Sequence, residues 1–231
     1  MLKKLKQDVF KANIDLVEHG LVLHTWGNAS ARDTESGLIV IKPSGVSYDS
    51  MKPEDMVVVN SQGEVVEGKF KPSMDAPTHL FLYNKWPSIG GIVHTHSTYA
   101  TSWAQAGKNI PPFGTTHADH YYGEVPCTRL LTNTEIEIDY EVNTGKIIFE
   151  RMDTVDPLTV PSVLVNAHGP FCWGSDAGNA VYNAVALEEI ARMAFYTVLL
   201  GKSEPIDQAL LDKHYKRKHG KSAYYGQHKS K

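Results

Sequence analysis

Short runs of β-branched residues, each closed by glycine, proline or histidine, constrain the fold of this chain most strongly. The clearest runs span residues 37–42, 91–95 and 163–165, and such runs are typical of buried strands. A further pair, 56–60 and 64–66, flanks a Ser-Gln-Gly turn and predicts a hairpin. The chain therefore contains several short strands that need other elements to cover them.

Stretches with apolar residues at helical spacing lie between and around these strands. We predict helices over residues 3–19, 75–86, 97–107, 175–200 and 206–219. A long loop rich in proline and glycine connects residues 109–131. Because no repeat or linker divides the sequence, we expect residues 1–231 to form one α/β domain, with an irregular tail from about residue 221.

The composition excludes several classes of protein. Hydrophobic residues make up 42% and charged residues 21% of the chain, as in ordinary globular proteins. The net charge of -3 argues against a nucleic-acid partner, because binding to a phosphate backbone usually needs a basic surface. The N-terminus lacks the apolar core of a signal peptide, and charged residues interrupt the longest apolar stretch, 180–200. We expect a cytoplasmic protein without a membrane partner, in which Cys127 and Cys172 are free thiols.

The most specific local feature is the segment His94-Thr95-His96. Residues i and i+2 of a strand point to the same face, so the two imidazoles should converge at the end of a strand. His168 also follows an apolar strand, and strand ends at one edge of a sheet are a common place for ligands. Three imidazoles favour zinc or a related ion. The alternative is a set of histidines satisfied by ordinary hydrogen bonds.

Two aspartates admit both a functional and a structural interpretation. Asp75 is a candidate fourth ligand, but it also stands where a helix N-cap is expected, and the two roles can coexist. Asp119 lies in the proline- and glycine-rich loop with His117 and His120. From the residues alone, a solvated turn is the favoured interpretation of Asp119, and surface or packing positions are favoured for the two histidines.

Two glycine-containing turns offer donors for an oxyanion. Residues 27–30 (GNAS) supply backbone N–H groups, an amide and a hydroxyl, whereas residues 42–45 (KPSG) supply a cation, a hydroxyl and backbone donors. Both patterns are also ordinary turn chemistry. Near the C-terminus, basic residues are expected to form a solvated helix face, and Tyr224-Tyr225 is expected to be a packing anchor.

Eight motifs occur together and in order, and their combination is highly specific. They are GNAS, IKPSG, KPSMDAPTH, GIVHTHS, GTTHADHYYG, NAHGPFCWG, LLDKHYKRKHG and AYYGQ. Over residues 5–227 the chain resembles the class II aldolase/epimerase family of metal-dependent sugar-phosphate enzymes. The resemblance implies a central, largely antiparallel sheet flanked by helices, a sugar-phosphate substrate, and a homotetramer with active sites between subunits.

The resemblance also implies roles for individual residues. It makes His94, His96 and His168 metal ligands, with Asp75 at or beside the ion, which is Zn²⁺ or alternatively Mn²⁺ or Co²⁺. It makes Asp119 and Tyr225 opposing acid/base groups, with Tyr225 reaching into a neighbour's site. His214 and Arg217 would support that shared site.

The same resemblance implies how the substrate is held, chiefly through its phosphate. The expected contacts are Gly27, Asn28, Lys42, Ser44, Gly45, Ser73 and Met74. Met74 departs from the family pattern, because a second serine is expected there and a thioether cannot donate a hydrogen bond. Its backbone N–H remains available as a donor.

Within the family, the chain resembles enzymes that invert C4 of a ketopentose phosphate, which serve arabinose and ascorbate-type catabolism. The C4 proton is not adjacent to the carbonyl, so its direct removal is very costly. Cleavage of the C3–C4 bond is easier, because the three-carbon fragment leaves as an enediolate that a divalent cation stabilises. One alternative is an aldolase that releases the fragments, but comparable aldolases carry Glu in place of Asp75. A non-catalytic metal-binding module is the other, and it leaves Asp119 and Tyr225 without a role.

Overall fold

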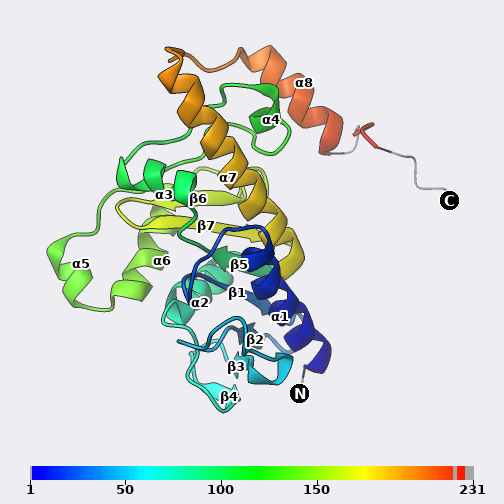
Figure 1. The fold of residues 1–231 in the computed structure, drawn as a ribbon, viewed down its shortest axis with the longest axis vertical. Coiled ribbons are helices and arrows are strands. Elements are labelled where there is room, and N and C mark those ends of the chain that lie inside the picture. The colour runs from blue at the N-terminus through cyan, green and yellow to red at the C-terminus, as the bar shows by residue number, and fades with distance from the viewer. Residues whose placement is uncertain (1, 221–222, 227–231) are drawn as a thin grey trace.

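The centre of the molecule is an antiparallel sheet. The computed structural model describes residues 2–220 and 223–226, and within them seven strands form one sheet in the order β4-β3-β2-β1-β5-β7-β6 (Figure 1). Every neighbouring pair is antiparallel. The strands are β1 (Asn28–Arg32), β2 (Ile39–Ile41), β3 (Val57–Val59), β4 (Val65–Glu67), β5 (Gly91–His94), β6 (Ser162–Val165) and β7 (Gly169–Gly174).

The antiparallel pairing determines which strand ends meet. β5 and β6 both pair antiparallel with β7, so they run in the same direction and their C-terminal ends lie at the same edge of the sheet. His94 is the last residue of β5, and His168 lies in the turn between β6 and β7. Pro161 precedes β6 and Gly174 ends β7, so these two residues lie at the opposite edge.

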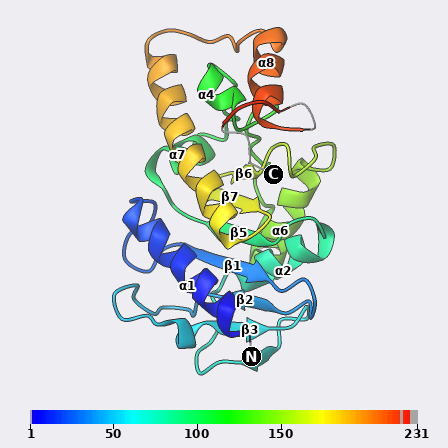
Figure 2. The ribbon, with the colours of Figure 1, turned by 90° about the vertical axis from the view of Figure 1, so that its right-hand side faces the viewer.

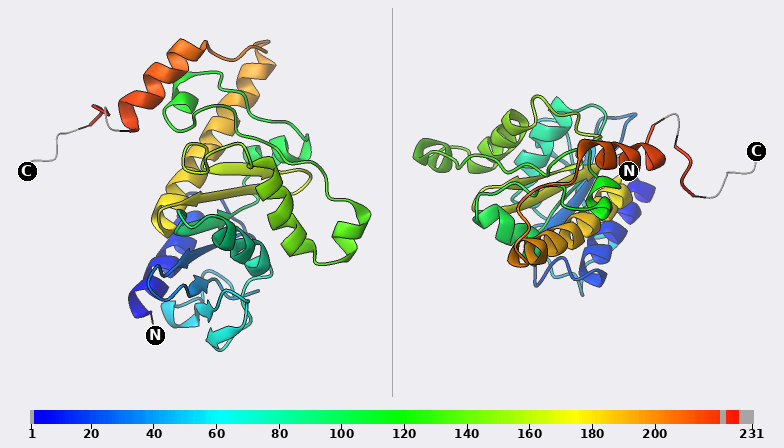
Figure 3. Two further views of the ribbon diagram at one scale, coloured as in Figure 1. Left: turned by 180° about the vertical axis from the view of Figure 1, so that it is seen from behind. Right: turned by 90° about the horizontal axis from the view of Figure 1, so that it is seen from above.

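Helices cover both faces of the sheet. α1 (Lys3–Glu18) and α7 (Ala177–Leu199) lie on one face, with α3 (Thr98–Gln105) packed against α7 (Figure 2). α2 (Ala76–Lys85) and α6 (Tyr140–Arg151) pack together on the other face (Figure 3). The connections contain the 3-10 helix η1 (Pro53–Asp55) and α5 (Asn133–Glu137). α4 (Thr115–Ala118) packs against α8 (Gln208–Lys218) at the end of the molecule away from β4 (Figure 1).

The apolar runs of the sequence form the interior of the sheet. All residues of β2 and β3 are buried, as are Phe171 and Trp173 of β7. Burial of one such side chain stabilises the folded state by about 1.5–3 kcal/mol. The centre of the sheet is therefore stable and fixes the positions of the residues at its edges. Gly91 permits a close approach of α7, because a Cβ at this position would clash with the backbone of Asp176.

Most predicted elements are confirmed, and the differences are local. The expected strands and hairpin correspond to β2, β5, β6 and β3–β4, and the expected helices to α1, α2, α3, α7 and α8. The prediction missed β1, β7 and α6, and the loop 109–131 contains the short helix α4. The turn predicted at 27–30 is wrong for Asn28–Ser30, because these residues begin β1 and pair with β5.

Two further predictions concern the C-terminal tail and membrane-spanning helices. Of the tail expected from about residue 221, only residues 223–226 are described, so Gln227 of the last motif lies outside the described residues. Among the described helices, none combines the length and apolar character needed to cross a membrane.

Candidate active site

Three histidines from two strand ends form a compact cluster. One ligand nitrogen from each of His94, His96 and His168 lies within 4.8 Å of the others. The ring centroids are 4.9 Å apart for His94 and His96, and 4.7 Å apart for His94 and His168. The cluster follows from the sheet, because β5 and β6 end at the same edge. This confirms that the three predicted histidines come together.

Hydrogen bonds and packing fix the orientation of these rings. His94 Nδ1 lies 3.0 Å from the carbonyl oxygen of Pro170. Because a carbonyl only accepts, Nδ1 carries the proton and the Nε2 lone pair of His94 points into the cluster. The His94 ring also stacks on Phe171, with centroids 4.2 Å apart. His168 Nδ1 contacts the Tyr140 hydroxyl at 3.3 Å.

The protonation of the cluster suits a metal ion. Burial lowers the pKa of His168 to about 3, with the neighbouring His94 and His96 lowering it further. Burial likewise lowers the pKa of His96. His94 Nε2 and His96 Nε2 lie 3.0 Å apart, so two nitrogens that can ligate converge. Neutral imidazoles with convergent nitrogens are the donor set that zinc and related ions favour, and the residues present therefore fit a divalent cation.

Asp75 stands beside the cluster and does not cap its helix. It occupies the N-cap position of α2, but its side chain makes no capping hydrogen bond. Instead, Asn28 Nδ2 donates to Asp75 Oδ2 at 2.6 Å. Burial alone would raise the pKa of Asp75, but His94, His79 and this hydrogen bond lower it. The capping interpretation of the side chain is wrong, and the carboxylate faces the histidines, although it is not within the three-residue cluster.

One pocket joins the histidines to the predicted phosphate contacts. We call it the histidine pocket, and its lining comprises Thr25, Trp26, Gly27, Asn28, Lys42, Pro43, Ser44, Gly45, Ser73, Met74, Asp75, His94, His96 and His168. The loops 42–45 and 71–75 are tied together, because Ser44 N donates to Lys71 O at 3.0 Å and Ser73 N donates to Lys42 O at 2.9 Å. Ser73 Oγ accepts from Asn28 Nδ2 at 3.1 Å, so its own proton is left to donate elsewhere.

Lys42 lines this pocket, and a backbone carbonyl of the following loop holds its ammonium group. Its Nζ donates to Val46 O at 3.0 Å and lies 4.7 Å from the centroid of the Tyr48 ring. Burial lowers the pKa of Lys42 to about 8. The side chain therefore brings a titratable positive charge to the base of the pocket.

Asp119 is the centre of a second, charged cluster. It follows α4 and accepts from His214 Nδ1 at 3.1 Å and from Arg217 Nη2 at 2.7 Å, and Lys218 Nζ lies 3.3 Å away. Burial would raise the pKa of Asp119, but the hydrogen bonds from Arg217, His214 and Lys218 lower it. The solvated turn favoured from the residues alone is therefore wrong. His214 and Arg217, which the resemblance implies would support the shared site, both contact Asp119.

Tyr225 lies in the same pocket as Asp119. This pocket, the Asp119 pocket, is lined by Asp119, His120, Leu158, Pro161, Gly174, Asn179, Tyr182, Asn183, Lys218, His219 and Tyr225. The Tyr225 ring packs under the cations of Lys218 and Arg217, at 4.7 and 5.3 Å, and its side chain is 64% exposed. The packing anchor expected at Tyr225 is wrong, because its ring faces solvent and cations rather than the core.

The two pockets lie at opposite edges of the sheet within one chain. His168 stands at the turn that joins β6 to β7, whereas Pro161 and Gly174, at the other ends of these strands, line the Asp119 pocket. A strand rises about 3.3 Å per residue, so the length of β7 alone separates the two edges by roughly 17 Å. Neither Asp119 nor Tyr225 lines the histidine pocket among the described residues.

Comparison with known proteins identifies the family. The family model described as "Class II Aldolase and Adducin N-terminal domain" matches residues 7–195. The chain belongs to the class II aldolase family. It is similar to "L-ribulose-5-phosphate 4-epimerase UlaF" of Salmonella paratyphi B (strain ATCC BAA-1250 / SPB7), with 57% identity over 98% of this chain and 100% of the relative. The protein of the same name from Salmonella typhi is also 57% identical over 98% of this chain and 100% of its own length.

Solved class II aldolase structures share the fold. An "L-fuculose 1-phosphate aldolase" superposes with a TM-score of 0.78 at 28% identity, covering 91% of this chain and 94% of that one. The L-fuculose 1-phosphate aldolase from Glaciozyma antarctica PI12 gives 0.77 at 20% identity, covering 96% and 84%. Class II aldolases depend on a metal ion, and the three-histidine cluster is the feature of this member that fits one.

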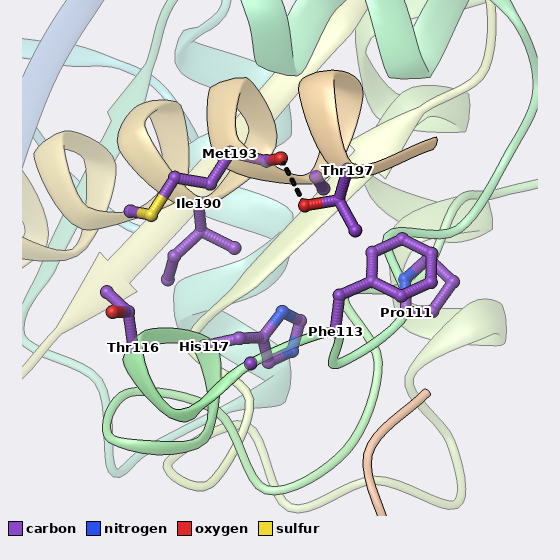
Figure 4. Close-up of a pocket in the computed structure, with 9 residues that line it drawn as sticks. Pro111, Phe113, Thr116, His117, Ile190, Met193 and Thr197 are labelled. Atoms are coloured by element: carbon purple, nitrogen blue, oxygen red, sulfur yellow. Dashed lines mark hydrogen bonds between the residues drawn. The ribbon is translucent and has the colours of Figure 1, made fainter. Parts of the chain in front are cut away.

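Two other histidines of the chain, His117 and His120, pack against neighbouring side chains and backbone. His117 is buried, its Nε2 lies 2.7 Å from Gly123 O, and burial lowers its pKa to about 4. Figure 4 shows His117 below Ile190 and Met193 of α7, in a small apolar pocket. His120 packs against the Tyr182 ring and lines the Asp119 pocket. The packing interpretation of His117 therefore agrees with its position.

Sequence reasoning missed several residues around the histidine pocket. Trp26 and Thr25 line it, Tyr48 lies beneath its loop, and Tyr140 contacts His168. Trp26 directly precedes the GNAS motif, which was a usable signal. Tyr48 and Tyr140 come from segments without a motif, so only the fold brings them to the site.

Proposed function

We propose that this chain interconverts L-ribulose 5-phosphate and D-xylulose 5-phosphate, as an L-ribulose-5-phosphate 4-epimerase. The observation that carries the proposal is the histidine pocket, in which three clustered imidazoles face donors suited to a phosphate. The names of the relatives that are 57% identical over the whole chain support the choice of reaction within the family. The presence of Asp75 beside the cluster fits the epimerase rather than the aldolases expected to carry Glu.

His94, His96 and His168 would hold the divalent ion, and we propose zinc because three imidazoles suit it well. The carboxylate of Asp75, held by Asn28 at 2.6 Å, would stand beside it. Manganese and cobalt are the alternatives that the same donors accept. When bound, the ion supplies a Lewis acid for the negative charge that develops on the sugar oxygens during cleavage.

The phosphate would be held by the paired loops. Ser44, Gly45, Ser73 and Met74 line the pocket. The two serine hydroxyls and the backbone N–H groups of Gly45 and Met74 would be the donors. Gly45 adopts a left-handed conformation with φ of 67°, which a glycine adopts without strain. The charge of Lys42 beneath the loop adds an electrostatic attraction for the dianion.

The reaction exchanges one carbon–carbon bond. A base takes the proton from the C4 hydroxyl, the C3–C4 electron pair remains with the three-carbon fragment as its enediolate, and C4 becomes the aldehyde of glycolaldehyde phosphate. The aldehyde turns and its opposite face is attacked by C3, and an acid then protonates the new C4 oxygen. Two acid/base groups on opposite sides of the fragment are therefore needed.

Asp119 and Tyr225 are the proposed acid/base pair. The lowered pKa of Asp119 keeps its carboxylate ionised and able to accept a proton, and Tyr225 offers a phenol in the same pocket. Because this pocket lies at the opposite edge of the sheet from the histidines, both groups would come from a neighbouring subunit. We propose a homotetramer in which each active site combines the histidine pocket of one chain with the Asp119 pocket of the next.

The test is incubation of the metal-loaded protein with L-ribulose 5-phosphate. Metal-dependent formation of D-xylulose 5-phosphate without net release of fragments is the expected result. Dihydroxyacetone and glycolaldehyde phosphate as the main products would instead identify an aldolase. Absence of any reaction despite bound metal would overturn the substrate assignment.

A further inference from the structure

Trp26 brings a large aromatic side chain to a pocket that is otherwise mostly polar. Its indole is 50% exposed and lines the histidine pocket. The ring centroid lies 6.3 Å from that of His96 and 5.6 Å from that of His24. The indole therefore stands at the rim of the pocket, directly beside a proposed metal ligand.

The backbone that carries Trp26 is fixed. The buried Tyr48 hydroxyl donates to the carbonyl oxygens of Trp26 and Gly27 at 3.0 and 2.9 Å. Trp26 N donates to Leu23 O at 2.9 Å. Gly27 has φ of 75°, and a Cβ there would lie 2.7 Å from His94 O, so this turn is pressed against the end of β5. The position of the indole at the rim is therefore set by the fixed backbone of residues 26–27, because the side chain itself is only half buried.

In the proposed reaction, the indole of Trp26 at the rim of the pocket can act on the released fragment. After the C3–C4 bond breaks, glycolaldehyde phosphate is no longer covalently joined to the other fragment. The loop donors hold its phosphate, but its aldehyde end must turn before re-addition. A directional hydrogen bond would favour one face of the aldehyde, whereas a flat apolar ring excludes water and lets the group turn against it.

We propose that Trp26 is a specificity-determining residue, which retains the aldehyde fragment between cleavage and re-addition. The inference rests on the proposed epimerase function and deepens it. It gives this side chain a part in retaining the fragment, in addition to the presence of Asp75 beside the metal site. The ring of Trp26 lies beside His24 and His96, and its backbone is held by Tyr48. We expect its effect on the partitioning of the fragment rather than on cleavage itself.

The experiment compares Trp26→Ala, Trp26→Leu and Trp26→Phe with the wild type as full-length, metal-loaded protein. L-ribulose 5-phosphate is the substrate, and both D-xylulose 5-phosphate and free glycolaldehyde phosphate are measured in one reaction. In Trp26→Ala the ratio of released fragment to epimer should rise about tenfold, which corresponds to about 1.4 kcal/mol. Trp26→Phe keeps a flat ring and should stay within about threefold of the wild type. Val65→Ala, an exposed apolar truncation on the edge strand β4, is the control and should leave the ratio unchanged.

Each outcome decides the proposal. An unchanged ratio in Trp26→Ala, with normal metal content, overturns it, because a merely structural role lowers total turnover without redirecting products. If Trp26→Ala is insoluble or loses its metal, the ratio in Trp26→Leu decides in the same way. If the wild type itself releases the fragments as its main products, the epimerase function fails and the Trp26 proposal falls with it.

Discussion

The histidine pocket and the Asp119 pocket are built in different ways. The histidine pocket draws its side chains from β5, the β6–β7 turn and the start of α2, and His94 at its base is 2% exposed. Burial lowers the pKa of His96 and of His168, and the positions of the imidazoles follow from strand pairing. The Asp119 pocket draws on the four-residue helix α4 and on α8. A hydrogen bond from His214 and ion pairs with Arg217 and Lys218 hold its aspartate.

This difference shows how the two tasks of the proposed reaction are divided. Ligation of a metal needs three nitrogens at fixed positions, which a sheet edge provides through its backbone hydrogen bonds. Transfer of a proton needs a controlled charge, which the cations around Asp119 provide. Because the two pockets face opposite edges of the sheet, one chain holds both sets of groups without bringing them together.

The largest expected effect is at the histidine pocket. His96→Ala should lose the bound metal and lower turnover by about a thousandfold or more, because one of three ligands is removed. Metal analysis and the epimerase assay on the same sample check this. His19→Ala, at the exposed end of α1, is the matched control and should keep both metal and activity. A metal-replete, active His96→Ala protein would contradict the ligand assignment.

The second prediction tests the separation of the two pockets. Asp119→Asn and Tyr225→Phe should each keep the metal and lose most turnover. Mixed tetramers of His96→Ala with Asp119→Asn should recover activity, because about one site in four then combines two intact pockets when each site draws on two adjacent chains.

Mixed tetramers of Asp119→Asn with Tyr225→Phe should recover nothing, since the two residues lie in one pocket of one chain. This pair is the control for the mixing procedure. Recovery in the second mixture, or none in verified tetramers of the first, would refute the proposed assembly of the site.

A smaller effect concerns Lys42 and pH. Its pKa is lowered to about 8, so its ammonium group is charged below that pH and becomes neutral above it. The KM for L-ribulose 5-phosphate should therefore rise roughly three- to tenfold between pH 7 and pH 9, as attraction for the phosphate is lost. In Lys42→Met the KM should already be raised at pH 7 and should change little with pH.

The control for Lys42 is Lys4→Met, which removes an exposed lysine of α1. This variant should keep the pH dependence of the wild type. If Lys42→Met shows the same rise in KM as the wild type, another group is responsible for it.

The smallest predicted effect is at Met74. Its side chain is 68% exposed and lines the histidine pocket, so Met74→Ser should fold normally and add one hydroxyl donor. We expect the KM to fall about two- to fivefold, in line with about 0.5–1 kcal/mol for one hydrogen bond. Met74→Ala removes the thioether without adding a donor and should leave the KM unchanged. An equal fall in both variants would show that only the bulk of Met74 matters.

The histidine pocket was far easier to predict than the Asp119 pocket. The run before His94 and the run before His168 each read as a buried strand, and two such strands ending at one sheet edge place their histidines together. His96 follows from its spacing to His94. These signals are local, so the residues alone indicated a metal site.

Asp119 gives no such local signal. Its partners His214 and Arg217 lie 95 and 98 residues away in the sequence, and only the packing of α8 on α4 brings them to it. From the residues alone, a solvated turn is therefore the favoured interpretation. The missed helix α6 is a similar case, because its interior Gly145 and its polar residues weaken the helical pattern, and packing against α2 overrides that weakness.

The position of the two pockets at opposite ends of β7 has a consequence for cells that make two versions of this chain. Under the proposed assembly, each chain contributes its histidine pocket to one active site and its Asp119 pocket to another. A chain with substitutions in both pockets inactivates the site built on its own histidines and also the neighbouring site that needs its Asp119. A cell that makes such a copy together with an intact one should lose more activity than a cell that simply makes half as much of the intact chain.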